Sequence, residues 1–148
     1  MVPVETLRSL ACLAGVPVDS LKALAAIAEE RDFKAGEVLW HEGDPVRWMC
    51  VVRQGEIDVI YQLQGGRQCV VDTVVGGEIT GWSAFVEPHR HTATCVARAS
   101  GRALYLEAAP MRALCEKDSL LGYRLLKQVA KTLSSRLESA RLQLVATG

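Results

Sequence analysis

The stretch FKAGEVLWHEGDPVRWMCVVRQGEIDVIYQLQGGRQCVVDTVVGGEITG, residues 33–81, decides the fold. Short apolar runs alternate in it with turn glycines, which recur about every ten residues. These are Gly36, Gly43, Gly55, Gly65, Gly66, Gly76, Gly77 and Gly81. Evenly spaced turns between short apolar runs are typical of an antiparallel sandwich or barrel. The stretch therefore predicts a β-rich core.

Six strands are expected, at residues 38–40, 48–52, 57–63, 68–75, 92–97 and 102–106. Gly65 and Gly66 lie between the third and the fourth of them. Positive φ angles cost glycine little, so this pair predicts the turn of a β-hairpin.

Helical patterns lie on both sides of this core. Apolar residues recur at helical spacing in residues 1–32, around a break at Gly15 and Pro17, and helical spacing returns after Pro110. The first group is Leu7, Leu10, Leu13, Leu21, Leu24, Ala25, Ile27 and Ala28. We expect one domain over residues 1–148, with N-terminal helices at 1–32, a jelly roll at 33–108 and C-terminal helices at 110–148.

The last helix carries a heptad seam. Its apolar residues are spaced four, three, four, three and four positions apart: Leu126, Ala130, Leu133, Leu137, Ala140 and Leu144. This period suits two supercoiled helices and predicts a parallel homodimer. The alternative is a helix that packs only on its own barrel. Charged residues are expected on the solvated flanks of the seam: Lys127, Lys131, Arg136, Glu138 and Arg141.

Composition excludes several classes of protein. The 17 basic residues balance 17 acidic ones, so no bulk field favours nucleic acid or an anionic membrane. No apolar stretch reaches the ~20 residues of a membrane span, and no secretory signal opens the chain. A cytoplasmic location is expected. The five cysteines are far apart in sequence and predict free thiols rather than disulfides or a zinc site.

Three segments resemble the cyclic-nucleotide-binding domains: residues 33–44 with their Gly-Glu and Gly-Asp pairs, residues 51–59, and residues 76–81. The chain looks most similar to the sensor half of the catabolite-activator and fumarate-nitrate-regulator transcription factors. The resemblance implies a double-stranded β-helix, or jelly roll. It also implies a ligand pocket beside a phosphate-binding cassette and dimerisation through the last helix.

The cassette that the resemblance implies comprises Gly81, Trp82, Ser83, Ala84, Arg90, His91, Thr92 and Ala93. It departs from the family pattern at both charged positions, because Trp82 stands where a glutamate is expected and His91 where an arginine is expected. Glu78 is assigned to the turn before the cassette. Two missing charge-assisted hydrogen bonds weaken a nucleotide complex by about two to four decades. We therefore expect a regulatory sensor that is weak or inactive toward cyclic AMP and cyclic GMP.

Two alternatives remain open for the site. Arg90 could bind the phosphate if a bulge turned its side chain to the opposite face of the extended segment. The chain would then be a genuine cyclic-nucleotide-binding regulator. Less favoured is a metal-dependent cupin-like enzyme using His89 and His91, because Cys95 and Val96 stand where a third ligand is wanted. The preferred interpretation has no catalytic residues, no metal and no resident cofactor, with a small-molecule ligand of unknown identity.

The relatives append a helix-turn-helix module after the long helix. This sequence ends at Thr147 and Gly148 and has no net charge. No DNA-binding module is therefore expected in the chain.

Overall fold

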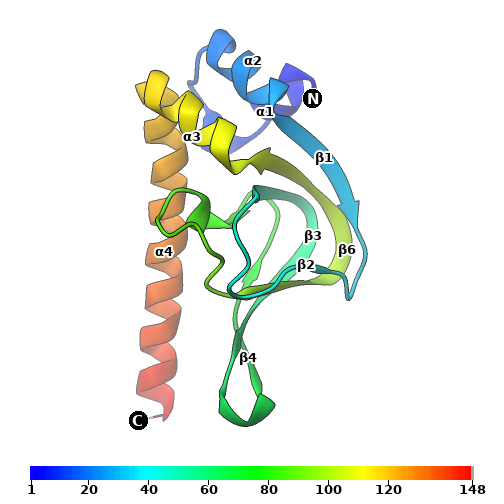
Figure 1. The fold of residues 1–148 in the computed structure, drawn as a ribbon, viewed down its shortest axis with the longest axis vertical. Coiled ribbons are helices and arrows are strands. Elements are labelled where there is room, and N and C mark those ends of the chain that lie inside the picture. Colours follow the sequence, from blue (N-terminus) through cyan, green and yellow to red (C-terminus); the bar gives the residue numbers. More distant parts are fainter. Residues whose placement is uncertain (148) are drawn as a thin grey trace.

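Antiparallel strands form a curled sheet in the computed structural model, which describes residues 1–147 (Figure 1). The strands are β1 (Ala28–Phe33), β2 (Val38–Trp40), β3 (Trp48–Gln62), β4 (Gln68–Val74), β5 (Ile79–Thr80) and β6 (Thr94–Glu107). Their order is β1-β6-β3-β4, with β2 also paired to β6 and β5 to β3. The predicted β-rich fold class is confirmed. The hairpin turn at Gly65 and Gly66 is also confirmed, since both have positive φ angles.

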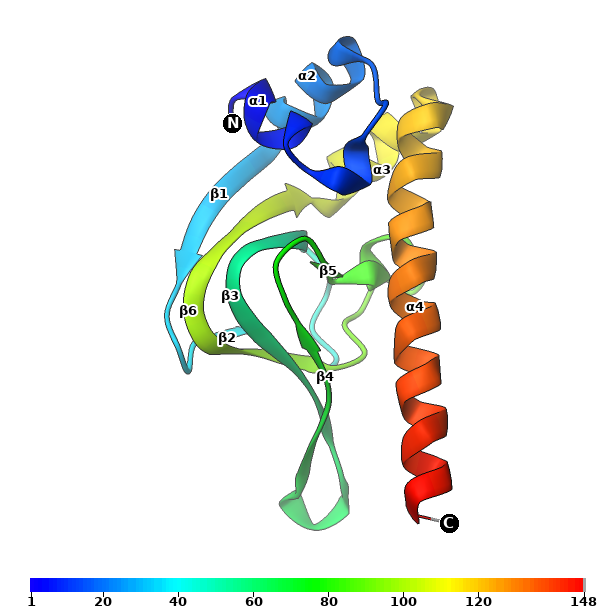
Figure 2. The ribbon, with the colours of Figure 1, turned by 180° about the vertical axis from the view of Figure 1, so that it is seen from behind.

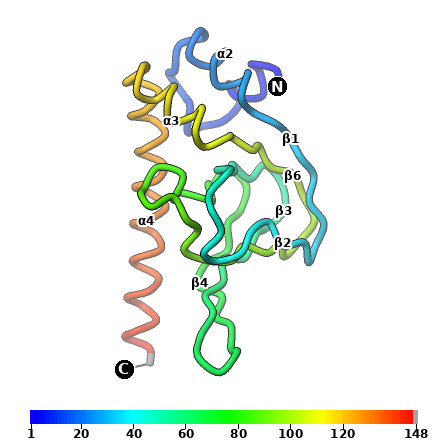
Figure 3. The backbone as a smooth tube through the Cα atoms, viewed as in Figure 1, coloured from blue at the N-terminus to red at the C-terminus, as the bar shows by residue number. Residues whose placement is uncertain are grey.

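Two strands are longer than predicted, because β3 and β6 each join two expected strands. The register between them shifts at three places from Val52 to Ile57, which marks bulges. Gly55 has a φ of 88° there. Gly101 lies opposite, and a Cβ on it would lie 2.0 Å from the carbonyl oxygen of Gln54. Bulges raise the local twist of a sheet, so both strands bend continuously here instead of ending (Figure 3).

The helices are α1 (Val4–Arg8), α2 (Val18–Ala26), α3 (Ala108–Lys117) and α4 (Ser119–Thr147), with a 3₁₀ turn at Ala11–Leu13. The prediction of helix through residues 1–32 is wrong at its end, because β1 begins at Ala28. Only Ala28 and Phe33 are buried in β1, at its two ends. Its middle therefore lacks the alternation that marks a strand. The predicted end of the last helix, residue 148, lies outside the described residues.

Two apolar cores hold these elements together. The first lies under the helices and includes Leu7, Leu24, Leu104, Leu121 and Leu125. The second lies inside the roll and includes Phe33, Trp40, Ile57, Ala97 and Tyr105. Helix α4 begins in the first core and then runs along the side of the roll (Figure 2).

The five cysteines are free thiols, with Cys50 and Cys95 buried. No helix in residues 1–147 has the length and apolar content needed to cross a membrane.

Candidate ligand pocket

The first half of the cassette is a tight turn after β5. Gly81 has a φ of 87° and is followed by a single 3₁₀ turn, Trp82–Ala84. A Cβ on Gly81 would lie 2.9 Å from the carbonyl oxygen of Trp48, so the turn requires glycine. Ser83 and Ala84 are buried and Trp82 is half-buried.

The turn before the cassette contains Glu78. Its Oε1 accepts a hydrogen bond of 2.9 Å from the backbone N–H of Val75. The backbone N–H of Glu78 donates in return to the carbonyl of Val75 at 3.0 Å. Glu78 therefore closes this turn, as the sequence predicts.

The second half of the cassette is anchored by His91, which is only 5% exposed. Its ring stacks on Trp40, with centroids 4.1 Å apart and planes 7° from parallel. Burial lowers the pKa of His91 to about 4, against a weaker opposing effect of Asp44. The imidazole is therefore neutral at neutral pH in the ligand-free chain.

The Arg90 side chain lies outside the cassette hollow. It is exposed and donates from Nη1 to the carbonyl oxygen of Gly43 at 2.9 Å. The alternative in which Arg90 binds the phosphate therefore requires this exposed side chain to leave the Gly43 carbonyl and turn toward the hollow.

The two candidate metal ligands have other contacts. His89 Nδ1 lies 3.0 Å from the carbonyl oxygen of Ser83, and His91 lies against Trp40. Within residues 1–147, no cluster of three His, Cys, Asp or Glu side chains could hold a metal ion.

Six of the eight predicted site residues line one hollow, and Ala84 and Arg90 lie outside it. The hollow is lined by Val59, Thr80, Gly81, Trp82, Ser83, His91, Thr92, Ala93, Cys95 and Arg136. Its volume is about 10 Å³. This is room for about one water molecule. The pocket at the cassette is thus filled by the protein's own side chains.

Arg136 of α4 is the site residue that sequence analysis missed. Its side chain is 12% exposed, and its Nε lies 3.4 Å from Asp72 Oδ2 of β4. Its Nη2 is buried and has no hydrogen-bond partner among the described residues. The prediction of a solvated flank is wrong for Arg136. It continues the four-three-four spacing of Leu125, Val129 and Thr132, on the side of the helix that faces the roll.

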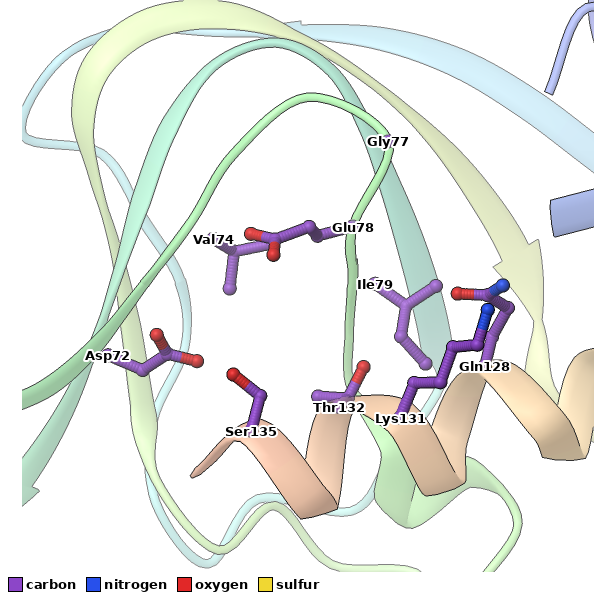
Figure 4. Close-up of a pocket in the computed structure, with 9 residues that line it drawn as sticks. All are labelled: Asp72, Val74, Gly77, Glu78, Ile79, Gln128, Lys131, Thr132 and Ser135. Carbon is purple, nitrogen blue, oxygen red and sulfur yellow. The ribbon is translucent and has the colours of Figure 1, made fainter. Parts of the chain in front are cut away.

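Two larger cavities lie between α4 and the strands. A polar one of about 280 Å³ contains Asp72, Glu78, Thr132 and Ser135 among its lining residues. Figure 4 shows Asp72 from β4 and Ser135 and Thr132 from α4 around its opening. A more apolar cavity of about 240 Å³ is lined by Tyr61, Val71, Trp82, Leu133, Arg136, Leu137, Ala140 and Gln143. The Asp72–Arg136 ion pair thus joins the walls of the two cavities.

The heptad seam of α4 is exposed, and three of its residues, Leu133, Leu137 and Ala140, also line the cavity of about 240 Å³ toward the strands. Leu121, Leu125 and Val129 make the buried side of the helix. All six predicted seam residues are exposed, including Leu126 at 49%, Leu133 at 36% and Leu137 at 53%. The alternative, a helix that packs only on its own barrel, would leave these six residues largely uncovered, and the homodimer stays a prediction.

Comparisons with known proteins identify the family and the fold. The family model of the cyclic nucleotide-binding domain matches residues 30–118, and the chain belongs to that family. The comparison with proteins of curated function found no match.

Solved structures share the fold. A Geobacter metallireducens GS-15 protein that carries the description of a cyclic nucleotide-binding protein is 28% identical, with a TM-score of 0.81 over 93% of this chain and 99% of that one. The N-terminal domain of a Streptomyces coelicolor A3(2) transcriptional regulator is 25% identical, with a TM-score of 0.68 over 93% and 95%. The catabolite activator protein of Thermus thermophilus is 20% identical, with a TM-score of 0.71. That match covers 92% of this chain and 62% of the activator.

Proposed function

We propose that this chain is a non-catalytic regulatory domain that binds cyclic AMP and cyclic GMP weakly or not at all and signals through α4 in a homodimer. The observation that carries the proposal is the hollow of about 10 Å³ at the cassette, which Arg136 enters from α4. A nucleotide would have to displace this side chain and break its ion pair with Asp72.

The chemistry of the cassette supports the same conclusion. Trp82 offers no carboxylate to a ribose hydroxyl, and the buried His91 offers no positive charge to a phosphate. Charge-assisted hydrogen bonds contribute on the order of 1.5–3 kcal/mol each. Their loss moves a sub-micromolar site to a dissociation constant of roughly 10 μM or weaker.

Thermal melting with 1 mM cyclic AMP or cyclic GMP tests this part of the proposal. A ligand with a dissociation constant of about 10 μM would add about 2.7 kcal/mol at this concentration, or about 10 °C in melting temperature. We expect a smaller shift, equal to the one that 5′-AMP causes as a control. A shift of more than about 10 °C, specific to a cyclic nucleotide, would contradict the proposal.

The dimer is supported by the apolar residues of α4 that the roll leaves exposed. The roll-facing residues of the helix already bury one side, while Leu126, Leu133 and Leu137 remain exposed, the last two at the edge of the cavity of about 240 Å³. An isolated apolar stripe on a long helix gains stability only when it is covered, and the heptad period suits a second copy of the helix. Ala130 and Ala140 leave room for close approach. In each chain, Leu133 and Leu137 of the seam lie within one helical turn of Arg136. A dimer through this seam would therefore place the interface next to the pocket.

A further inference from the structure

We propose that Arg136 is the anion-binding residue of a small organic acid. The acid group pairs with the guanidinium, and a flat apolar body lies in the cavity beside Trp82. This inference rests on the proposed function, since it names a ligand class for the same sensor in place of a cyclic nucleotide.

The guanidinium of Arg136 is incompletely paired. An arginine can bind a carboxylate with two parallel N–H donors, from Nε and the Nη2 on the same edge. Asp72 reaches only Nε, with its Oδ2 at 3.4 Å, and the buried Nη2 has no partner in the described residues. Asp72 cannot easily do better, because its Oδ1 accepts a hydrogen bond of 2.9 Å from the backbone N–H of Thr73. On the edge of the guanidinium that carries Nε and Nη2, only Nε therefore has a hydrogen-bond partner.

A buried, half-paired guanidinium is costly unless another group completes its hydrogen bonds. A free carboxylate has no such tie to Thr73 and, once the guanidinium turns toward the cavity, can align both oxygens with Nε and Nη2. It would therefore compete with Asp72 for the same edge. The pairing would be shorter and stronger than the present single contact.

The cavity of about 240 Å³ beside Arg136 supplies the space for the rest of the molecule. It is smaller than the sites of drug-sized ligands, so it suits a fragment with a single ring. Trp82 and Tyr61 contribute aromatic side chains to its lining, and Val71 and Leu137 contribute aliphatic ones. One cation in a largely apolar cavity favours a planar acid over a neutral or cationic ligand.

Ligand binding would reach the interface through α4. Leu133 and Leu137 line the cavity and also belong to the heptad seam. A second copy of α4 on this seam would lie next to the bound acid. Release of Asp72 would also free β4 from its ion pair with α4.

The test uses benzoate as the probe and isothermal titration calorimetry of the whole chain. We expect benzoate to bind with a dissociation constant on the order of 1 mM. Benzamide has the same shape without the charge and should bind at least tenfold more weakly. Arg136→Gln should weaken benzoate binding about ten- to hundredfold. Asp72→Asn removes the internal competitor and should tighten binding severalfold.

Arg98→Gln is the matched control, because Arg98 is 59% exposed and should leave binding unchanged. Equal binding of benzoate and benzamide would overturn the inference without any variant. So would the absence of benzoate binding at about 20 mM, or undiminished binding by a folded Arg136→Gln chain. Tight binding of cyclic AMP would overturn the proposed function and leave the benzoate result standing, so the two failures are distinguishable.

Discussion

The rings of Trp40 and His91 stack face to face, and the burial of His91 at this contact lowers its pKa to about 4, where the family pattern has a charge. An unfolded His91 has a pKa of about 6.5. Between pH 6.5 and 4 the unfolded chain therefore binds a proton at His91 that the folded chain does not. Stability falls as the pH is lowered through this window. NMR titration should place the His91 midpoint near pH 4, and His91→Gln should lose this part of the pH dependence. A midpoint near 6.5 would contradict the stacked, buried ring.

Trp82 fills space between the cassette and α4. It packs against the first core and lines the hollow of about 10 Å³. We expect Trp82→Ala to destabilise the protein by about 2 kcal/mol, less than for a fully buried tryptophan because Trp82 is half-buried. Urea unfolding measures this change. A loss below about 0.5 kcal/mol would mean that Trp82 is only a surface residue.

The homodimer predicts a specific response to charge on the seam. Leu133→Glu together with Leu137→Glu would place like charges opposite each other in a dry contact, which is costly. Light scattering should show a folded monomer with unchanged β-rich circular dichroism. Leu142→Glu is the control, since Leu142 is 64% exposed and lies off the seam. A wild-type chain that is already monomeric at tens of micromolar would contradict the dimer.

The crossing of β3 and β6 predicts a strong steric effect. A Cβ on Gly101 would meet the carbonyl oxygen of Gln54 at 2.0 Å, whereas a Cβ on Gly76 would lie 3.2 Å from that of Arg53. Gly101→Ala should cost about 3 kcal/mol or more in chemical unfolding, and Gly76→Ala less than about 1 kcal/mol. Equal effects of the two substitutions would show that the backbone at Gln54 and Gly101 can move apart at little cost.

The sequence predicted most of the fold because turn glycines and heptad spacing are local signals. It divided β3 and β6 at Gly55 and Gly101, since a strand that continues through a bulge has the same local pattern as two strands with a turn. It missed β1, whose four middle residues are all exposed. Such a strand is defined by its pairing with β6, which is not visible in its own pattern.

The glycines of the sequence predict where the cassette lies. They do not predict whether side chains of the protein fill the hollow beside it. The sequence predicts that Trp82 and His91 belong to the cassette, and both line the hollow. Whether Arg136 also reaches the hollow depends on which face of α4 meets the roll. The spacing from Leu125 to Arg136 was the available signal, since it puts a charge on a stripe of roll-facing residues. Arg136 was instead assigned to the flank of the seam. Two overlapping apolar stripes on one helix make that choice ambiguous without the tertiary contacts.

Isothermal titration calorimetry of the wild-type chain with cyclic AMP and cyclic GMP tests the central claim most directly. A cassette filled by Trp82, His91 and Arg136 predicts no dissociation constant tighter than roughly 10 μM for either nucleotide. A sub-micromolar constant for one of them would contradict the account, because it would require the nucleotide to displace Arg136 and bind without either charged partner.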